Sequence, residues 1–282
     1  MKKNVSKKTK TNNGTLEWSD KTINCCKGCS HGCVYCFAKG MALQYGQLTE
    51  DQWSSERIRQ HDVIRKHRKY PGRVMFPSSH DITPNNLSAC LQVLDNLLVL
   101  REIKRKNGSK KLMGGNDVLI VSKPHLKCIQ AICQQFEGYR DRILFRFTIG
   151  AQDDRLLSLF EPNAPIYSER KASLQLACDR GFQTSISVEP MLDSANIDAL
   201  IADLLPFVTD AIWVGTMNKI GRYYKKVGPE VQAALDVIIN GQTNEIIRAI
   251  YARHRNNAKI KWKNEIKEII GIPLAPKPGM DI

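Results

Sequence analysis

The sequence has no long apolar run. Nowhere in its 282 residues is there a stretch of about 18 consecutive apolar residues, the length that a membrane-spanning helix needs. Residues 1–8 are basic and polar and lack the apolar core of a signal peptide. Both absences favour a soluble, intracellular protein, and we expect a cytoplasmic location with no membrane partner.

Acidic residues are scarce relative to basic ones. The chain has 28 Asp and Glu against 42 Lys and Arg, which gives a formal net charge of +14. Basic residues gather in the stretches 64–73, 101–111, 222–226 and 248–267. Because each phosphate contact releases counterions, this balance favours a nucleic acid or a nucleotide-like substrate, although a solvated basic surface is the alternative. Residues 1–14 are expected to form a disordered basic arm.

No repeat and no low-complexity linker divides the chain, so we expect one main domain. Apolar strands alternate with helical patterns, which predicts an α/β fold with a parallel sheet covered by helices. We expect a partial (β/α)6 barrel over residues 15–220 and a C-terminal helical extension, residues 221–282, packed on it. A helix is expected over 49–69 and a basic loop over 101–116. The six predicted strands are 21–25, 73–76, 117–121, 142–147, 184–188 and 211–214.

Cysteine is present in an odd number, nine, and five of the nine lie between residues 25 and 36. This distribution does not suit a disulfide framework and fits reduced thiols. Cys29, Cys33 and Cys36 are spaced C-x3-C-x2-C, with Tyr35 just before the last. Soft thiolates at this density select iron–sulfur clusters, zinc or copper. Three ligands would leave one corner of a [4Fe–4S] cluster open to an external ligand, whereas ferredoxins usually fill all four positions.

Two further cysteines, Cys25 and Cys26, leave a zinc site open as an alternative. Either could join the motif cysteines or His31 in a tetrahedral zinc site. The chain would then be a non-catalytic, zinc-containing nucleic-acid-binding protein, with the cysteine loop as a structural clip.

Polar residues directly follow the predicted strands. In parallel barrels such residues ring the C-terminal mouth, where sites form. Glu189 and Asn218 are our candidates for substrate binding, although Glu189 could also hold a neighbouring strand. The polar residues after the second to sixth strands are Ser78, Ser79, His80 and Asp81, then Lys123, then Thr148 and Gln152, then Glu189, and last Asn218.

The cysteine motif resembles the signature of the radical S-adenosylmethionine (SAM) superfamily. The resemblance implies a radical SAM barrel and an enzyme that reductively cleaves SAM to a 5′-deoxyadenosyl radical. That radical would abstract hydrogen from a substrate, and an electron donor of the flavodoxin or ferredoxin type is implied. Other stretches, in order over residues 22–220, are similar to the spore photoproduct lyase-like (DNA repair photolyase-like) branch: Gly28–Ala38, Val121–Lys123, Glu161–Pro165 with Arg170, Ser187–Pro190 and Val214–Asn218.

The resemblance also implies roles for single residues. Glu161 and Arg170 are expected to form a buried ion pair that fixes a loop rather than to act in catalysis. The motif cysteines would ligate a [4Fe–4S] cluster whose open iron chelates SAM. The implied SAM contacts are Tyr35 at the adenine, Ser78 and Ser79 at the methionine end, Lys123 at the carboxylate, and Thr148 at the ribose or methionine part.

Two features of the branch and its relatives are missing. No Gly-Gly-Glu follows the second predicted strand, where many radical SAM enzymes have it. Spore photoproduct lyase returns a hydrogen atom from a cysteine shortly before the second-strand acidic residue, but residues 76–80 before Asp81 contain no thiol. This difference weakens the case for thymine-dimer splitting, with Cys90, Cys128, Cys133 or a tyrosine as the alternative hydrogen donors. Cys90, Cys128 and Cys133 lie on predicted helices and are expected in the core.

Overall fold

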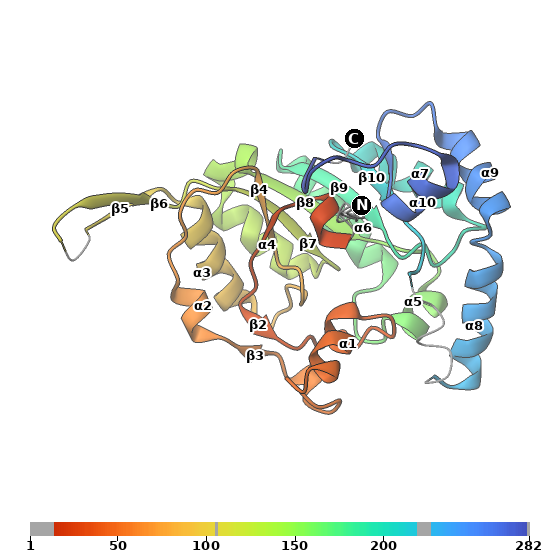
Figure 1. Cartoon of the computed structure of the whole chain (residues 1–282), viewed down its shortest axis with the longest axis horizontal. Helices are drawn as coiled ribbons and strands as arrows, with labels where there is room; N and C mark the ends of the chain where they lie inside the picture. The colour runs from red at the N-terminus through yellow and green to blue at the C-terminus, as the bar shows by residue number, and fades with distance from the viewer. Residues whose placement is uncertain (1–13, 105–106, 219–226, 281–282) are drawn as a thin grey trace, which may run out of the picture.

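The computed structural model describes residues 14–104, 107–218 and 227–280. The expected arm over residues 1–14 lies outside the described residues except for Gly14. The body is a seven-stranded sheet in the order β1-β4-β7-β8-β9-β10-β11, and all its neighbouring strands are parallel (Figure 1). The strands are β1 (Lys21–Thr22), β4 (Arg73–Phe76), β7 (Asp117–Ser122), β8 (Ile143–Thr148), β9 (Gln183–Val188), β10 (Ile212–Val214) and β11 (Ile260–Trp262).

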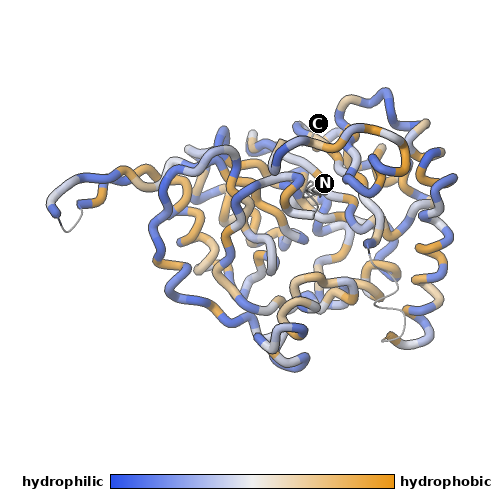
Figure 2. The backbone as a smooth tube through the Cα atoms, viewed as in Figure 1, coloured by the Kyte–Doolittle hydropathy of each residue, from blue (hydrophilic) through white to orange (hydrophobic). Residues whose placement is uncertain are grey.

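Helices cover one face of this sheet and build the main core with it. Val118 and Ile120 of β7 belong to the large buried cluster shared with the helices, and Figure 2 shows the apolar strands inside the fold. Leu119 faces the opposite, concave side, where it packs with Met75 and Leu144. Strands buried on both faces are typical of parallel sheets. The helices that follow strands are α3 (Leu87–Leu98), α4 (Leu126–Gln135), α5 (Asp154–Phe160), α6 (Tyr167–Asp179), α7 (Ile197–Leu204) and α10 (Asn264–Ile270).

The predicted α/β partial barrel is confirmed, but the sheet has a seventh strand in addition to the six predicted ones. β11 pairs with β10 and comes from the C-terminal segment, which was expected to be helical only. It is three residues long and carries a lysine in its middle, so it has no apolar run to reveal it. The helices expected in this segment do form, as α8 (Pro229–Asn240), α9 (Asn244–His254) and α10.

Two other expectations are wrong. The helix expected over 49–69 is replaced by a short 3-10 turn (Trp53–Ser55), the strand β3 (Arg57–Ile58) and the helix α2 (Gln60–Ile64). Glu56 takes a left-handed backbone conformation, φ 45°, and β3 pairs with β2 (Cys26–Lys27), so long-range pairing overrides the local helical pattern. The basic loop expected over 101–116 contains a β-hairpin, formed by β5 (Arg101–Lys104) and β6 (Lys110–Met113).

The segment before β1 lies on the concave side of the sheet. Its 3-10 turn, Gly14–Glu17, is followed by Trp18, whose ring centroid lies 5.9 Å from that of Trp213 on β10. The Arg146 guanidinium contacts both rings, 4.6 Å from the Trp18 centroid and 5.1 Å from the Trp213 centroid. This segment therefore fills the floor of the open barrel. Among the described residues, no helix is long and apolar enough to cross a membrane.

Candidate metal and cofactor site

The cysteine loop lies after β1, at the carboxyl end of the sheet, and leads into helix α1 (Phe37–Gln44). Cys29 and Cys33 are each 6% exposed, and Cys36 is partly buried. The Cys36 sulfur caps α1 by accepting the Lys39 backbone N–H at 3.4 Å. The amino end of a helix stabilises negative charge, so this contact opposes the rise in the Cys36 pKa that burial causes.

A close turn fixes the start of the loop. The Cys29 amide donates to the Trp53 carbonyl at 2.9 Å. Gly28 has φ 92°, and a Cβ there would lie 2.2 Å from the Trp53 oxygen, so only glycine fits. The Ser30 amide and hydroxyl both donate to Glu56 Oε1, at 2.8 and 2.7 Å. The β2–β3 segment thus positions the first motif cysteine.

The expected ion pair fixes the other end of the loop. Glu161 Oε2 lies 2.5 Å from Arg170 Nη2, and both side chains are 0% exposed. The Tyr35 hydroxyl donates to Glu161 Oε1. Burial, with the Glu161 charge second, raises the pKa of Tyr35 well above its ordinary value, so the phenol stays protonated. The predicted pair is confirmed, and it connects directly to the cysteine motif through Tyr35.

Asp81, after β4, gathers charged and polar groups beside the cysteines. Its Oδ1 accepts the Lys123 backbone N–H at 2.8 Å, and its Oδ2 lies 2.8 Å from His31 Nδ1 and 3.5 Å from Lys123 Nζ. Burial would raise the pKa of Asp81, but Lys123 and His31 hold it well below its ordinary value. Burial works against the Lys123 charge too, yet Asp81 raises the pKa of Lys123 well above its ordinary value. Both groups are therefore charged in this partly dry site.

Lys123 also acts on the motif thiols. Burial raises the pKa of Cys33 to about 12 and raises those of Cys29 and Cys36, and the positive charge of Lys123 opposes the rise in all three. The thiols would release their protons on binding a metal, as thiolate ligands must. Three sulfurs with one buried cation beside them suit an anionic iron–sulfur cluster, so the donor set fits the predicted cofactor.

A second set of ligand atoms overlaps the cysteine motif. A sulfur of Cys29, a ring nitrogen of His31 and a carboxylate oxygen of Asp81 lie within 4.8 Å of one another. Such a group could hold a single zinc ion, but it has three ligands, whereas structural zinc sites have four. It uses neither Cys33 nor Cys36, so the two kinds of site are distinguishable by mutation.

The upstream cysteines point elsewhere. Cys25 Sγ lies 3.9 Å from Cys90 Sγ and 4.0 Å from His80 Nε2. Cys26 Sγ contacts the backbone carbonyls of Lys27 and Gly28. Among the contacts of the described residues, neither thiol joins the motif cysteines. Cys90, Cys128 and Cys133 are buried in the core, as expected.

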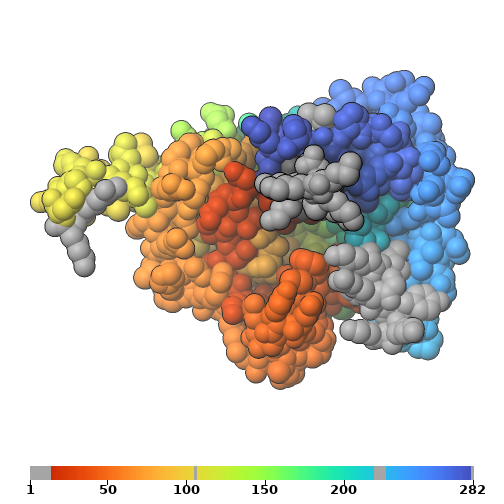
Figure 3. Space-filling view, viewed as in Figure 1, coloured from red at the N-terminus to blue at the C-terminus, as the bar shows by residue number. Residues whose placement is uncertain are grey.

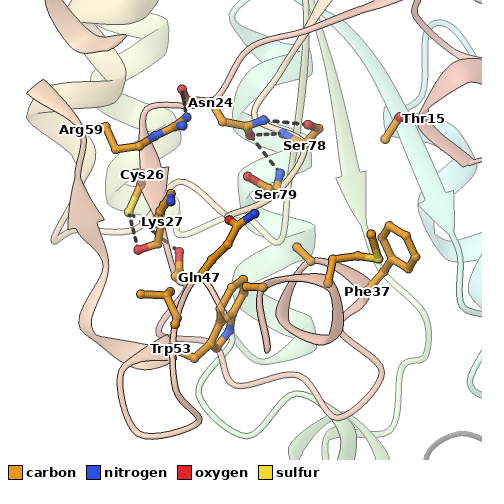
Figure 4. A pocket seen from close by; sticks show the side chains of 15 residues that line it. Thr15, Asn24, Cys26, Lys27, Phe37, Gln47, Trp53, Arg59, Ser78 and Ser79 are labelled. Carbon is orange, nitrogen blue, oxygen red and sulfur yellow. Dashed lines mark hydrogen bonds between the residues drawn. The ribbon is translucent and has the colours of Figure 1, made fainter. Parts of the chain in front are cut away.

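A cavity of about 360 Å³ lies between the cysteine loop, α1 and the loop after β4 (Figure 4). Ser78 and Ser79 line it together with Asn24. Asn24 Oδ1 accepts the Ser78 and Ser79 amides at 2.7 and 2.9 Å, and its Nδ2 donates to the Ser78 hydroxyl at 2.9 Å. The volume is in the range of small-molecule pockets. Asn24 was not predicted because the expected first strand, 21–25, included it, whereas the observed strand β1 ends at Thr22.

The other predicted site residues lie outside the lining of this cavity. Tyr35 and Lys123 lie together, with Lys123 Nζ 5.7 Å from the Tyr35 ring centroid. Thr148 is partly buried at the end of β8, and its carbonyl accepts from Arg170 Nη1 at 3.3 Å. Asn218 is exposed. The roles assigned to these residues stay predictions.

Glu189 belongs to a separate cluster on the concave side. Lys263 Nζ lies 3.2 Å from Glu189 Oε2 and 2.9 Å from Glu17 Oε1. Glu265 Oε1 accepts the Thr216 amide at 3.1 Å. Burial raises the pKa of Glu189, and burial with the Glu189 charge raises the pKa of Glu265 to about 7. Glu189 therefore holds Lys263 of the C-terminal segment, a contact that was not predicted from the sequence.

Comparisons with known proteins agree with this architecture. No family model matches the chain. An uncharacterized protein of Acidianus two-tailed virus, ORF301, is 23% identical over 201 residues, 66% of this chain and 62% of that protein. The chain thus spans less than two thirds of that relative's length.

Two solved structures share the fold. Spore photoproduct lyase complexed with a dinucleoside spore photoproduct matches with a TM-score of 0.52 at 11% identity, covering 92% of this chain and 80% of that one. A mutant of the same enzyme with bound AdoMet and the dinucleoside gives a TM-score of 0.50 with the same identity and coverage. The chain therefore has the partial-barrel fold of the radical SAM enzymes. This likeness to spore photoproduct lyase confirms the resemblance at the level of the fold.

Proposed function

We propose that this chain is a radical SAM enzyme that acts on nucleic acid or a nucleotide. The observation that supports it most directly is the position of the motif thiols. Cys29, Cys33 and Cys36 lie at the carboxyl end of a radical SAM-type sheet, where the Lys123 charge acts on all three. A [4Fe–4S] cluster bound there would supply the electron that cleaves SAM to methionine and a 5′-deoxyadenosyl radical, which abstracts hydrogen from the substrate.

The protein's own residues would bind SAM and orient it. Lys123 is a buried cation held by Asp81 and is suited to pairing with the SAM carboxylate. The Ser78 and Ser79 hydroxyls would contact the methionine end, and Asn24 fixes the backbone amides of both residues. Tyr35, whose hydroxyl is held by Glu161, would offer its ring to the adenine. A flavodoxin- or ferredoxin-type protein would supply the electron.

The substrate class rests on two observations. The formal net charge of +14 favours a polyanion, and the similar spore photoproduct lyase structure is complexed with a dinucleoside. Because residues 76–80 contain no thiol, we propose hydrogen abstraction from a nucleotide without assigning the splitting of a thymine dimer.

The test is anaerobic reconstitution with iron and sulfide, followed by dithionite and SAM. We expect 5′-deoxyadenosine to form, as detected by liquid chromatography and mass spectrometry, and to be absent from the Cys33→Ala variant. If the parent protein binds iron but forms no 5′-deoxyadenosine, the proposal is wrong.

The second candidate is a zinc-containing nucleic-acid-binding protein without catalysis. The Cys29, His31 and Asp81 group is the observation that favours it. In that case purified protein would contain zinc that is lost in His31→Ala and kept in Cys36→Ala. The cluster assignment predicts the opposite dependence, because Cys36 is a cluster ligand and His31 is not.

A further inference from the structure

We propose that the β5–β6 hairpin is a DNA-binding element that enters the major groove of a duplex. We call residues 101–104 and 110–113 the basic hairpin. It projects from the body beside α2 and α3 (Figures 1 and 3). Its strands pair only with each other among the described residues, with Arg101 opposite Met113 and Lys104 opposite Lys110.

The basic hairpin exposes apolar side chains beside its basic ones. Leu112 on β6 and Leu100 just before β5 are each 60% exposed. A two-stranded ribbon without a third strand or a covering helix is only marginally stable in water. Together with the exposed charges, these apolar residues offer a surface that a bound partner would cover.

Charge identifies the partner as a polyanion. The basic hairpin has Arg101, Lys104, Lys110 and Lys111 against one acid, Glu102. Lys110 pairs with Glu102 and Arg101 with Asp95. Lys104 and Lys111 have no carboxylate partner in the part of the chain that the structure describes. Two such hairpins would repel each other, so a second copy of this chain is a poor occupant.

A second basic stretch joins the hairpin at its base. The Gly114 amide donates to the His67 carbonyl at 2.6 Å, which brings the exposed Arg65 and Arg68 next to the hairpin. Arg142 Nη1 donates to the Gly115 carbonyl at 2.7 Å. The His67–Gly114 hydrogen bond thus joins the stretch 64–73 to the base of the basic hairpin. The stretch 248–267 does not contribute in the same way, because its Lys263 and Lys267 are buried.

The shape of the basic hairpin favours duplex DNA over RNA. The paired strands of a ribbon lie about 4.8 Å apart, and a ribbon with its side chains fits the B-form major groove, which is about 12 Å wide. The major groove of A-form RNA is deep and narrow, and side chains do not reach into it. The lysines would contact the phosphates, and Leu112 would pack against thymine methyl groups at the groove floor.

The basic hairpin and the cofactor site lie at opposite ends of the sheet. The hairpin connects the end of α3 to the start of β7, so it lies at the amino end of the strands. The cysteine loop lies at the carboxyl end. The hairpin is therefore a tether that raises the local concentration of substrate, and it is not part of the cofactor site. The inference rests on the proposed nucleic-acid substrate, but binding and SAM cleavage can be measured independently.

The test uses the full-length reconstituted protein and fluorescence anisotropy with a labelled 20-base-pair DNA duplex at two salt concentrations. The variant is Lys104→Gln with Lys111→Gln. The matched control is Lys127→Gln with Lys277→Gln, which removes the same charge from two exposed lysines outside the hairpin. We expect the hairpin variant to bind roughly tenfold more weakly than the control and to lower the salt slope by about 2, since each lost phosphate contact lowers it by about 0.9.

Four results would overturn the assignment, three of them from comparisons of variants or nucleic acids and one from the parent protein alone. The first is equal binding by the hairpin variant and the control. The second is equal or tighter binding of the parent protein to double-stranded RNA or single-stranded DNA of the same sequence. The third is a change in iron content or in 5′-deoxyadenosine formation in the hairpin variant, which would place the hairpin in the cofactor site. If the parent forms 5′-deoxyadenosine but binds no duplex, the hairpin proposal fails and the proposed chemistry stands. Hairpin-dependent DNA binding without 5′-deoxyadenosine supports the hairpin proposal alone.

Discussion

The Glu161–Arg170 pair is expected to be the main support of the cysteine loop. Replacing Glu161 by Gln leaves the Arg170 charge unpaired in a position where both side chains are 0% exposed. Removing one partner of a buried ion pair costs about 3–5 kcal/mol. The same substitution replaces the carboxylate that accepts the Tyr35 hydroxyl with a neutral amide. We therefore expect the free energy of unfolding to fall by about 3–5 kcal/mol.

Urea unfolding followed by tryptophan fluorescence measures this loss in the cluster-free, reduced protein. The matched control is Glu137→Gln, which breaks a surface pair with Arg140 whose side chains are 58% and 42% exposed. Exposed pairs contribute about 0–1 kcal/mol to stability, so the free energy of unfolding of the control should change little. A second readout is iron retention after reconstitution, which we expect to fall in Glu161→Gln because Tyr35 lies next to Cys36. A stability loss no larger than that of the control would refute the reasoning.

Two further predictions concern charged groups of the concave side and the cofactor site. Lys123→Ala should weaken SAM binding roughly tenfold or more while iron content stays unchanged, since a charge-assisted contact contributes about 1.5–3 kcal/mol. Equilibrium dialysis with labelled SAM measures the affinity. An unchanged affinity would mean that Lys123 only holds Asp81 and does not bind SAM. Burial raises the pKa of Glu265 from 4.5 to about 7, so the folded protein holds this proton more tightly than the unfolded chain does. Relative to Glu265→Gln, the unfolding free energy of the parent should fall as pH rises from about 4.5 to 7, by at most roughly 3 kcal/mol. Parallel stability curves for the two proteins in urea titrations across this range would contradict the assignment.

The sequence predicts well those features that depend on local pattern. The apolar run in β7 and the helical periodicity of α3 gave elements close to the observed ones, because buried strands and covering helices leave clear patterns. The cysteine motif located its loop because metal ligands are recognisable by type and spacing. Glu161 and Arg170 were paired correctly because they lie close together in sequence around two prolines.

Features that depend on contacts between distant segments could not be predicted in this way. Lys263 looks like a surface lysine in sequence, yet it is buried against Glu17 from the opposite end of the chain. The helical pattern after residue 49 gave way to a pairing between β2 and β3. Asn24 became part of the cavity only because β1 and β4 lie side by side. In each case a residue or strand from a distant part of the chain determines the local structure, so the neighbouring sequence does not reveal it.

The central claim, that the motif cysteines hold a [4Fe–4S] cluster, is tested most directly by metal content. Each of Cys29→Ala, Cys33→Ala and Cys36→Ala is compared with a Cys25→Ala, Cys26→Ala double variant after anaerobic reconstitution. We predict about four iron atoms per chain in the double variant, as in the parent, and loss of the iron in each of the three motif variants. Loss of iron from the double variant with retention in Cys29→Ala, or a content of zinc without iron in the parent, would contradict the claim.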